Sequence, residues 1–104
     1  MRNRLKRYQH YITLQSAPTV QDSEYTDFKS VSAAIVPVSG REFIAGLAVQ
    51  SEITHQIFMW YTDGVKPNMR VKYGTRNFEI MSVINIEETS RELKLYCKEL
   101  FING

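Results

Sequence analysis

The 104-residue sequence contains one cysteine, Cys97, so no disulfide can form within the chain. Such cysteine usage is typical of a protein made in a reducing cytoplasm. No stretch approaches the ~20 consecutive apolar residues that a membrane-spanning helix needs. The N-terminus also lacks the apolar segment of a secretory signal peptide. The sequence therefore predicts a protein with no membrane partner, made and kept inside a cell or inside something assembled there.

Neither sign of charge is in large excess. The chain has 13 Lys and Arg against 11 Asp and Glu, and the two signs are mixed along it. A dedicated duplex binder shows a stronger basic stripe. Only the N-terminus is lopsided, with cations at Arg2, Arg4, Lys6 and Arg7. We interpret these residues as a solvated terminus, and a contact with DNA phosphates is the weaker alternative.

Residues that carry catalysis are also scarce. His10, His55 and Cys97 have no metal-ligand spacing. There is no glycine-rich phosphate loop and no nucleophile elbow. Glu87 and Glu88 are adjacent in a predicted turn, where solvation explains them better than acid–base chemistry. We expect no enzymatic activity and no cofactor.

Alternation of apolar and polar residues is the dominant pattern in the chain, and it predicts half-buried strands. The alternating segments are Tyr8–Gln15, Met69–Tyr73, Arg76–Ile86 and Leu93–Lys98, and Ser30–Val38 also reads as a strand. Between two of them, Gly74-Thr75 fits a type II′ hairpin turn. The pattern places Phe78, Ile80, Ile84 and Ile86 on one face. Ser16–Asp27 has no apolar period and is predicted to be a long loop.

One segment has helical rather than alternating spacing. Ser39 and Glu42 match a capping box, and apolar residues follow at helical intervals, so we expect a short helix over Gly40–Gln50. Arg41 would lie in the first turn, where a cation opposes the helix dipole. We therefore expect Arg41 to serve a subunit interface. The fold class is mainly β: a single-domain antiparallel barrel or sandwich over residues 1–104, with one short helix and one long loop.

The run Ile57–Tyr61 is apolar on both strand faces. Either both faces are covered within the monomer, or one is covered by a neighbouring subunit. Phe58 and Trp60 are the interface candidates if the second reading holds.

Several segments together resemble the phage head-tail joining family, whose members are also called head closure or head-tail adaptor proteins. The similar segments are Tyr11–Gln15, Pro37–Glu42, Glu52–His55, Gly64–Gly74, Arg76–Ile80, Ser82–Asn85 and Arg91–Glu99, and they occur in the family's order. The family loop often carries an acidic residue followed by Tyr-Gly. Here Asp22, Glu24 and Tyr25 are present as further interface candidates, and Thr26 replaces the glycine.

The resemblance implies a structural virion protein at the head-tail connector. Such a protein is made in the host cytoplasm and forms a ring, twelvefold by the portal's symmetry. The ring closes the DNA-filled head and presents a surface to the tail. The implied partners are portal and adaptor proteins, tail proteins, other copies of the chain, and packaged DNA bound without sequence specificity.

Two alternatives stay open. The first is a small barrel that binds single-stranded nucleic acid through aromatic and basic residues on one face. Its candidate aromatic residues are Tyr8, Tyr11, Tyr61 and Tyr73. The second is a tail-completion component, which differs only in the neighbour it contacts.

Overall fold

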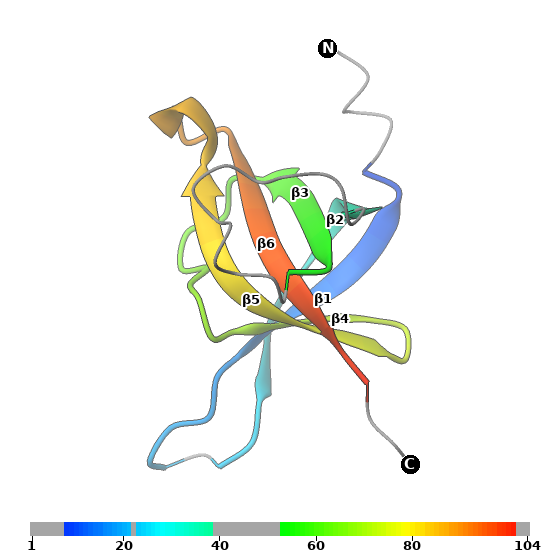
Figure 1. Cartoon of the computed structure of the whole chain (residues 1–104). Helices are drawn as coiled ribbons and strands as arrows, with labels where there is room; N and C mark the ends of the chain where they lie inside the picture. Colours follow the sequence, from blue (N-terminus) through cyan, green and yellow to red (C-terminus); the bar gives the residue numbers. More distant parts are fainter. Residues whose placement is uncertain (1–7, 22, 39–52, 102–104) are drawn as a thin grey trace.

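The computed structural model describes residues 8–21, 23–38 and 53–101. Six antiparallel strands form a closed barrel in the order β1-β2-β3-β6-β5-β4 (Figure 1). The elements are β1 (His10–Ser16), β2 (Thr26–Pro37), β3 (His55–Trp60), β4 (Arg70–Tyr73), β5 (Arg76–Asn85), the 3-10 turn η2 (Ile86–Glu88) and β6 (Glu92–Leu100). The predicted fold class, an antiparallel β-barrel, is confirmed. Within the described ranges, no helix is long and apolar enough to cross a membrane.

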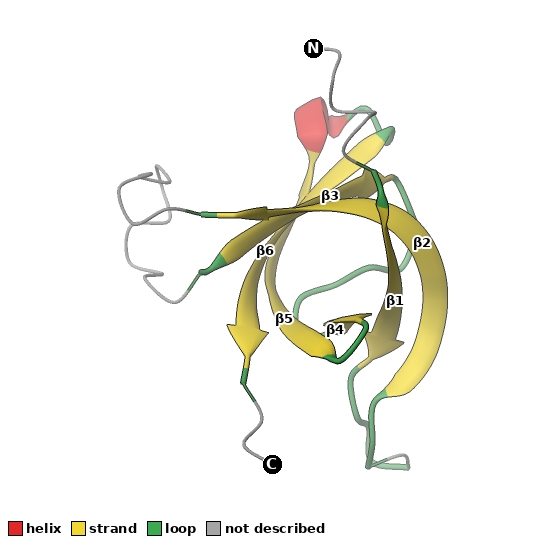
Figure 2. Ribbon diagram, turned by 90° about the vertical axis from the view of Figure 1, so that its right-hand side faces the viewer, coloured by secondary structure: helices red, strands yellow, loops and turns green. Residues whose placement is uncertain are grey.

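The barrel is closed by a short contact between β1 and β4. Three residue pairs make it: Thr13 with Lys72, Leu14 with Val71, and Gln15 with Arg70. Figure 2 shows the strands surrounding the interior on all sides. Closure gives the backbone groups of both strands partners that an open sheet edge would leave unpaired.

The core lies inside the barrel and receives side chains from every strand. Its fully buried members include Ile12, Leu14, Ala33, Ile57, Met59, Val71, Phe78, Ile80, Leu95 and Cys97. These residues confirm the predicted alternation in β1, β4 and β6. Cys97 is a small buried hydrophobe, and burial raises the pKa of its thiol.

Two β-bulges bend the strands and change which residues face inward. The β1–β2 register passes from Leu14–Lys29 to Gln15–Asp27, so Phe28 is the extra residue. In the same way, the β5–β6 register leaves Met81 unmatched. A bulge inverts the facing of every later residue in its strand.

The bulge at Met81 overturns one prediction. Ile84 and Ile86 were expected to share the face of Phe78 and Ile80. Instead, Val83 packs against the core and 38% of the Ile84 surface is exposed. The alternating pattern carries no signal for an inserted residue, because apolar residues occupy both parities after the bulge.

The turns largely follow the sequence prediction. Gly74 has φ +62 and joins β4 to β5 through the predicted two-residue loop. Gly64, with φ +91, and Asn68, with φ +79, punctuate the chain before β4. β2 begins at Thr26, earlier than the predicted Ser30, so the long loop covers only residues 17–25. The helix expected at residues 40–50, its capping residues and Arg41 lie outside the described residues.

The sequence left open whether both faces of the run Ile57–Tyr61 are covered within the monomer or one is left for a neighbouring subunit, and the structure shows some of each. Ile57 and Met59 point into the core. Phe58 points outward by alternation, yet it is buried within the single chain, as are its outward-facing neighbours Ala34 and Tyr96. Only the end of the run, Trp60 and Tyr61, stays substantially exposed, at 51% and 40%.

The inverted facing after Met81 predicts unequal costs for two isoleucines on the same strand. Ile80→Ala removes fully buried methyl groups and should lower the free energy of unfolding by about 2–5 kcal/mol. Ile84→Ala removes partly exposed atoms and should cost less than about 1 kcal/mol. Urea unfolding of the two variants measures the difference. Equal losses would mean that the two side chains share one face and that the bulge is absent.

Candidate functional site

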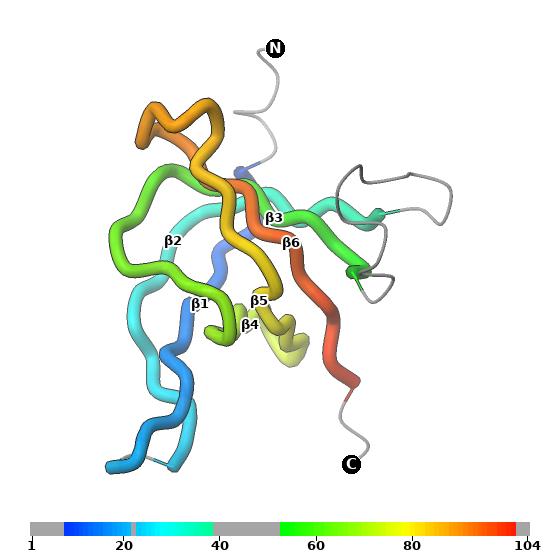
Figure 3. The backbone as a smooth tube through the Cα atoms, turned by 60° about the vertical axis from the view of Figure 1, so that its left-hand side comes forward, coloured from blue at the N-terminus to red at the C-terminus, as the bar shows by residue number. Residues whose placement is uncertain are grey.

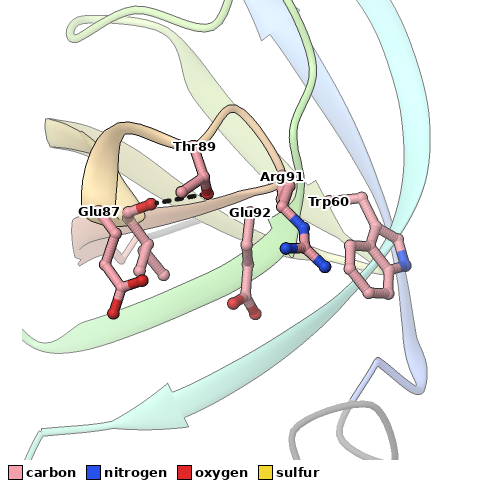
Figure 4. A pocket seen from close by; sticks show the side chains of 6 residues that line it. Trp60, Glu87, Thr89, Arg91 and Glu92 are labelled. Atoms are coloured by element: carbon pink, nitrogen blue, oxygen red, sulfur yellow. Dashed lines mark hydrogen bonds between the residues drawn. The ribbon is translucent and has the colours of Figure 1, made fainter.

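Trp60 forms part of a pocket at the end of the barrel where β3 stops and β6 begins. Trp60 and Glu92 are cross-strand partners, and the Tyr61 N–H donates to the Arg91 carbonyl at 2.9 Å. The Tyr8 ring packs against Trp60 at 5.2 Å between centroids, and the Tyr8 hydroxyl donates to the Glu92 carboxylate. The surface cavity here, the Trp60 pocket, has about 270 Å³. Its lining residues are Trp60, Ile86, Glu87, Thr89, Arg91 and Glu92 (Figure 4).

The turn beside this pocket has an unusual backbone. Glu87, Glu88 and Ser90 have φ values of +55, +55 and +56, in the left-handed region that non-glycine residues seldom adopt. Asn85 holds the turn, because its amide oxygen accepts from the Ser90 N–H at 2.9 Å and its amide nitrogen donates to Ser90 Oγ. Backbone conformations of this kind cost free energy and cluster at functional surfaces. The turn therefore presents two carboxylates in a fixed, strained geometry.

A second cavity, of about 430 Å³, lies over the seam between β1 and β4. Its lining residues are Gln15, Glu24, Tyr25, Arg70, Lys72 and Asn77, and we call it the Arg70 pocket. The Arg70 guanidinium carbon lies 3.9 Å from the Tyr25 ring centroid. Arg70 and Lys72 both point outward, because Val71 between them points into the core. The loop 17–25 and the strand β4 thus combine to form one basic, aromatic-backed site.

A third cluster joins the ends of β3, β5 and β6. Arg76 donates two hydrogen bonds to the Glu99 carboxylate, at 2.8 and 3.1 Å. His55 Nδ1 lies 2.8 Å from Thr54 Oγ1, which also accepts from the Glu99 N–H at 2.8 Å. The His55 ring packs edge-on against Phe78. His55 is thus a hydrogen-bonded strand histidine, and the cluster ties three strands together.

The charges in this cluster are set by the same contacts. The hydrogen bond from Arg76 holds the pKa of Glu99 below its ordinary value. Burial lowers the pKa of His55; the Glu99 carboxylate opposes that shift and Arg76 adds to it. A neutral His55 with its proton on Nδ1 fits the geometry, since Nε2 then accepts from Arg76 at 3.5 Å. The side chains of the cluster already have hydrogen-bond partners in the same chain, and the role of the cluster is to stabilise the barrel.

The predicted site residues fall into three groups. Arg2, Arg4, Lys6, Arg7, Asp22 and Arg41 lie outside the described residues. Glu24 and Tyr25 line the Arg70 pocket, and Trp60 lines the pocket named after it. Phe58 is 9% exposed, so it offers a partner far less surface than Trp60 does.

Sequence reasoning missed Arg70, Lys72 and Arg91. Arg70 and Lys72 occupy the outward positions of a correctly predicted strand, so their outward direction could be predicted. The contact of Arg70 with Tyr25 could not be predicted, because it joins the strand to a loop more than forty residues away.

The aromatic residues proposed for nucleic-acid stacking are partly engaged already. Tyr8 packs against Trp60, and Tyr73 packs edge-on against His10 at 5.1 Å. Tyr11 is the most open of the four, with 67% of its surface exposed. Base stacking needs open ring faces along one groove, and this arrangement gives that alternative little support.

The fold and its sites define a small closed barrel with a filled interior, whose polar and aromatic groups gather on its outside. A family model described as phage head completion protein matches residues 2–100, and the chain belongs to this family. Membership implies that the protein is a structural component of the phage particle and that it contacts head and tail components.

One solved structure shows the same fold. It is the solution structure of protein SF1141 from Shigella flexneri 2a, which is 21% identical and superposes with a TM-score of 0.70. The match covers 89% of this chain and 93% of that one. No curated protein sequence matches the chain.

The Arg76–Glu99 pair predicts a pH-dependent contribution to stability. Because the pKa of Glu99 is lower in the folded state, the pair stabilises the fold fully above the unfolded value, near pH ~4.3. The contribution is lost as pH falls below that value. Arg76→Gln should therefore cost about 1 kcal/mol at pH 7, since Arg76 is partly exposed, and less at pH 3.

Urea unfolding at the two pH values measures the effect. Arg91→Gln is the matched control, and its loss should not change with pH in this way. A loss from Arg76→Gln that is the same at both pH values would show that the pair is not the source.

Proposed function

We propose that this protein forms a ring at the head-tail connector, closes the DNA-filled head and provides the surface to which the tail attaches. The observation that carries the proposal is the family match over residues 2–100. A ring seated under the portal would follow the portal's twelvefold symmetry. The protein would be made in the host cytoplasm and would meet portal or adaptor proteins, tail proteins and the packaged DNA.

The barrel suits this role for two physical reasons. Its closed sheet has a filled core, so it is a rigid block that can be stacked without rearrangement. Its two ends also differ: the β5–β6 turn lies at one end, and the loop 17–25 projects from the other (Figures 1 and 3). An assembly that contacts a head on one side and a tail on the other needs a subunit whose two ends differ.

The Trp60 pocket is the strongest candidate for a contact with another connector protein. Tryptophan, tyrosine and arginine are the residues most enriched at binding hot spots. Trp60, Tyr61 and Arg91 supply all three at one end of the barrel. A tail-completion role would use the same surface and differs only in the protein bound there.

In vitro complementation tests the function itself. Phage lacking the gene should yield heads that package DNA and then lose it, and that accept no tails. Addition of the purified protein to such heads should restore DNA retention and tail joining. Normal infectious particles formed without the gene would contradict the proposal.

If the Trp60 pocket binds another connector protein, a substitution at Trp60 should impair assembly and leave the stability of the fold unchanged. Trp60→Ala should lower complementation activity at least about tenfold, because loss of a hot-spot tryptophan costs ~2 kcal/mol or more of binding. Tyr11→Ala removes another exposed aromatic side chain, from the side of the barrel, and should stay within about twofold of the wild type.

Thermal unfolding of both variants is the control for folding, and both melting temperatures should stay close to the wild-type value. Full complementation activity of Trp60→Ala would contradict the proposal that the Trp60 pocket contacts another connector protein.

A further inference from the structure

Among the residues that the structure describes, Arg70 forms no ion pair. Its Nε atom is buried and has no hydrogen-bond partner. Glu79 is its direct cross-strand neighbour on β5, yet the two side chains form no ion pair. The guanidinium instead lies over the Tyr25 ring. Tyr25 therefore orients Arg70 without satisfying its hydrogen-bond donors.

The surroundings of Arg70 indicate what chemical group would accept its hydrogen bonds. Lys72 adds a second cation on the same outer face, two residues along β4. Gln15 and Asn77 add amides on the flanking strands, directly opposite Arg70 and Lys72. An arginine fork beside a lysine suits a carboxylate, which can take two parallel hydrogen bonds from the guanidinium.

Carboxylates of the matching kind are presented by the β5–β6 turn. Glu87 and Glu88 are exposed, and within the described part of the chain neither forms an ion pair. Hydrogen bonds from Thr89 to the Ile86 carbonyl and between Asn85 and Ser90 hold the turn in its left-handed conformation. The two acidic side chains are thus displayed on a fixed support.

The turn and the pocket cannot meet within one copy. Asn77, in the Arg70 pocket, lies at the start of β5, and the turn follows Asn85 at the end of that strand. The eight steps from Asn77 to Asn85, at ~3.3 Å each, correspond to about 26 Å of strand. Figures 1 and 3 show the turn at one end of β5 and β4 at the other. A carboxylate from this turn can reach Arg70 only from a second molecule.

We propose that the Glu87–Glu88 turn of one copy binds in the Arg70 pocket of the next copy, with carboxylates on Arg70 and Lys72. Two different surfaces meet in such a contact, so it repeats from copy to copy and closes into a ring when the rotation allows. The inference rests on the proposed function, because the connector ring is the assembly that it would join.

Charge reversal tests the contact on filled heads that lack the native protein. Arg70→Glu with Lys72→Glu, and separately Glu87→Arg with Glu88→Arg, should each lower the amount of protein retained on heads at least about tenfold. All four substitutions in one chain should restore retention to within about threefold of the wild type. Thermal unfolding confirms that each variant folds. A folded fourfold variant that fails to recover overturns the inference.

Crosslinking tests the same contact in a variant that keeps both Arg70 and Glu87. A variant with Lys72→Cys and Glu88→Cys, bound to heads and treated with a short bismaleimide, should give a ladder of chain multiples. Each single substitution should give none, because Cys97 is buried. Variant protein present on heads without a ladder overturns the inference and leaves the proposed function standing. Wild-type protein that never binds heads overturns the proposed function itself.

DNA is the alternative occupant of the pocket, and the same variants detect it. A random-sequence single-stranded oligonucleotide is the probe. If Arg70→Glu abolishes its binding while the fourfold variant fails to restore head retention, the pocket binds phosphate and the copy-to-copy contact is wrong. Unchanged oligonucleotide binding together with restored retention supports the contact.

Discussion

The short pairing of β1 with β4 is the constraint on which the rest of the structure depends. Three residue pairs close the barrel, of which one faces the interior and two face outward. Leu14 and Val71 meet inside and complete the core. Gln15, Arg70 and Lys72 lie outside and form half of the lining of the Arg70 pocket. If this seam opened, two strand edges would be exposed, and the core and the pocket would be disrupted together.

The closed barrel also fixes how far apart the surface features lie. Asn77 of the Arg70 pocket lies near the start of β5, and the Glu87–Glu88 turn lies beyond the end of that strand. Because the barrel is filled and rigid, the basic pocket and the acidic turn cannot approach one another within a copy. Opposite charges held apart on a rigid block favour association from copy to copy, and they suit a component of a polar assembly such as the phage connector.

Much of the fold was predictable from alternation and turn residues. Ile12, Leu14, Leu95 and Cys97 are buried where the pattern placed them, and Gly74 makes the expected hairpin. The face of Ile84 was predicted wrongly, because the bulge at Met81 leaves no mark in a strand that is apolar on both parities. The burial of Phe58 on the outer face was one of two readings, since a five-residue apolar run does not show what covers it.

The candidate sites were harder to predict than the fold. Trp60 was identified because it belongs to a run that is apolar on both strand faces, and Tyr25 because of the family resemblance. Arg70 was missed, since nothing in the local pattern of β4 distinguishes a solvated cation from one held on an aromatic ring by a distant loop. Glu87 and Glu88 were read as solvated turn residues, because a sequence carries no record of left-handed backbone geometry at non-glycine positions.

The central claim is that this barrel is a connector subunit whose outer surfaces hold copies together in a closed ring. Cryo-electron microscopy of filled, tailless heads tests it most directly. The account predicts a ring of barrels beneath the portal, with the β5–β6 turn of each copy against Arg70 of the next. A connector that retains DNA and contains no density for this barrel would contradict the account.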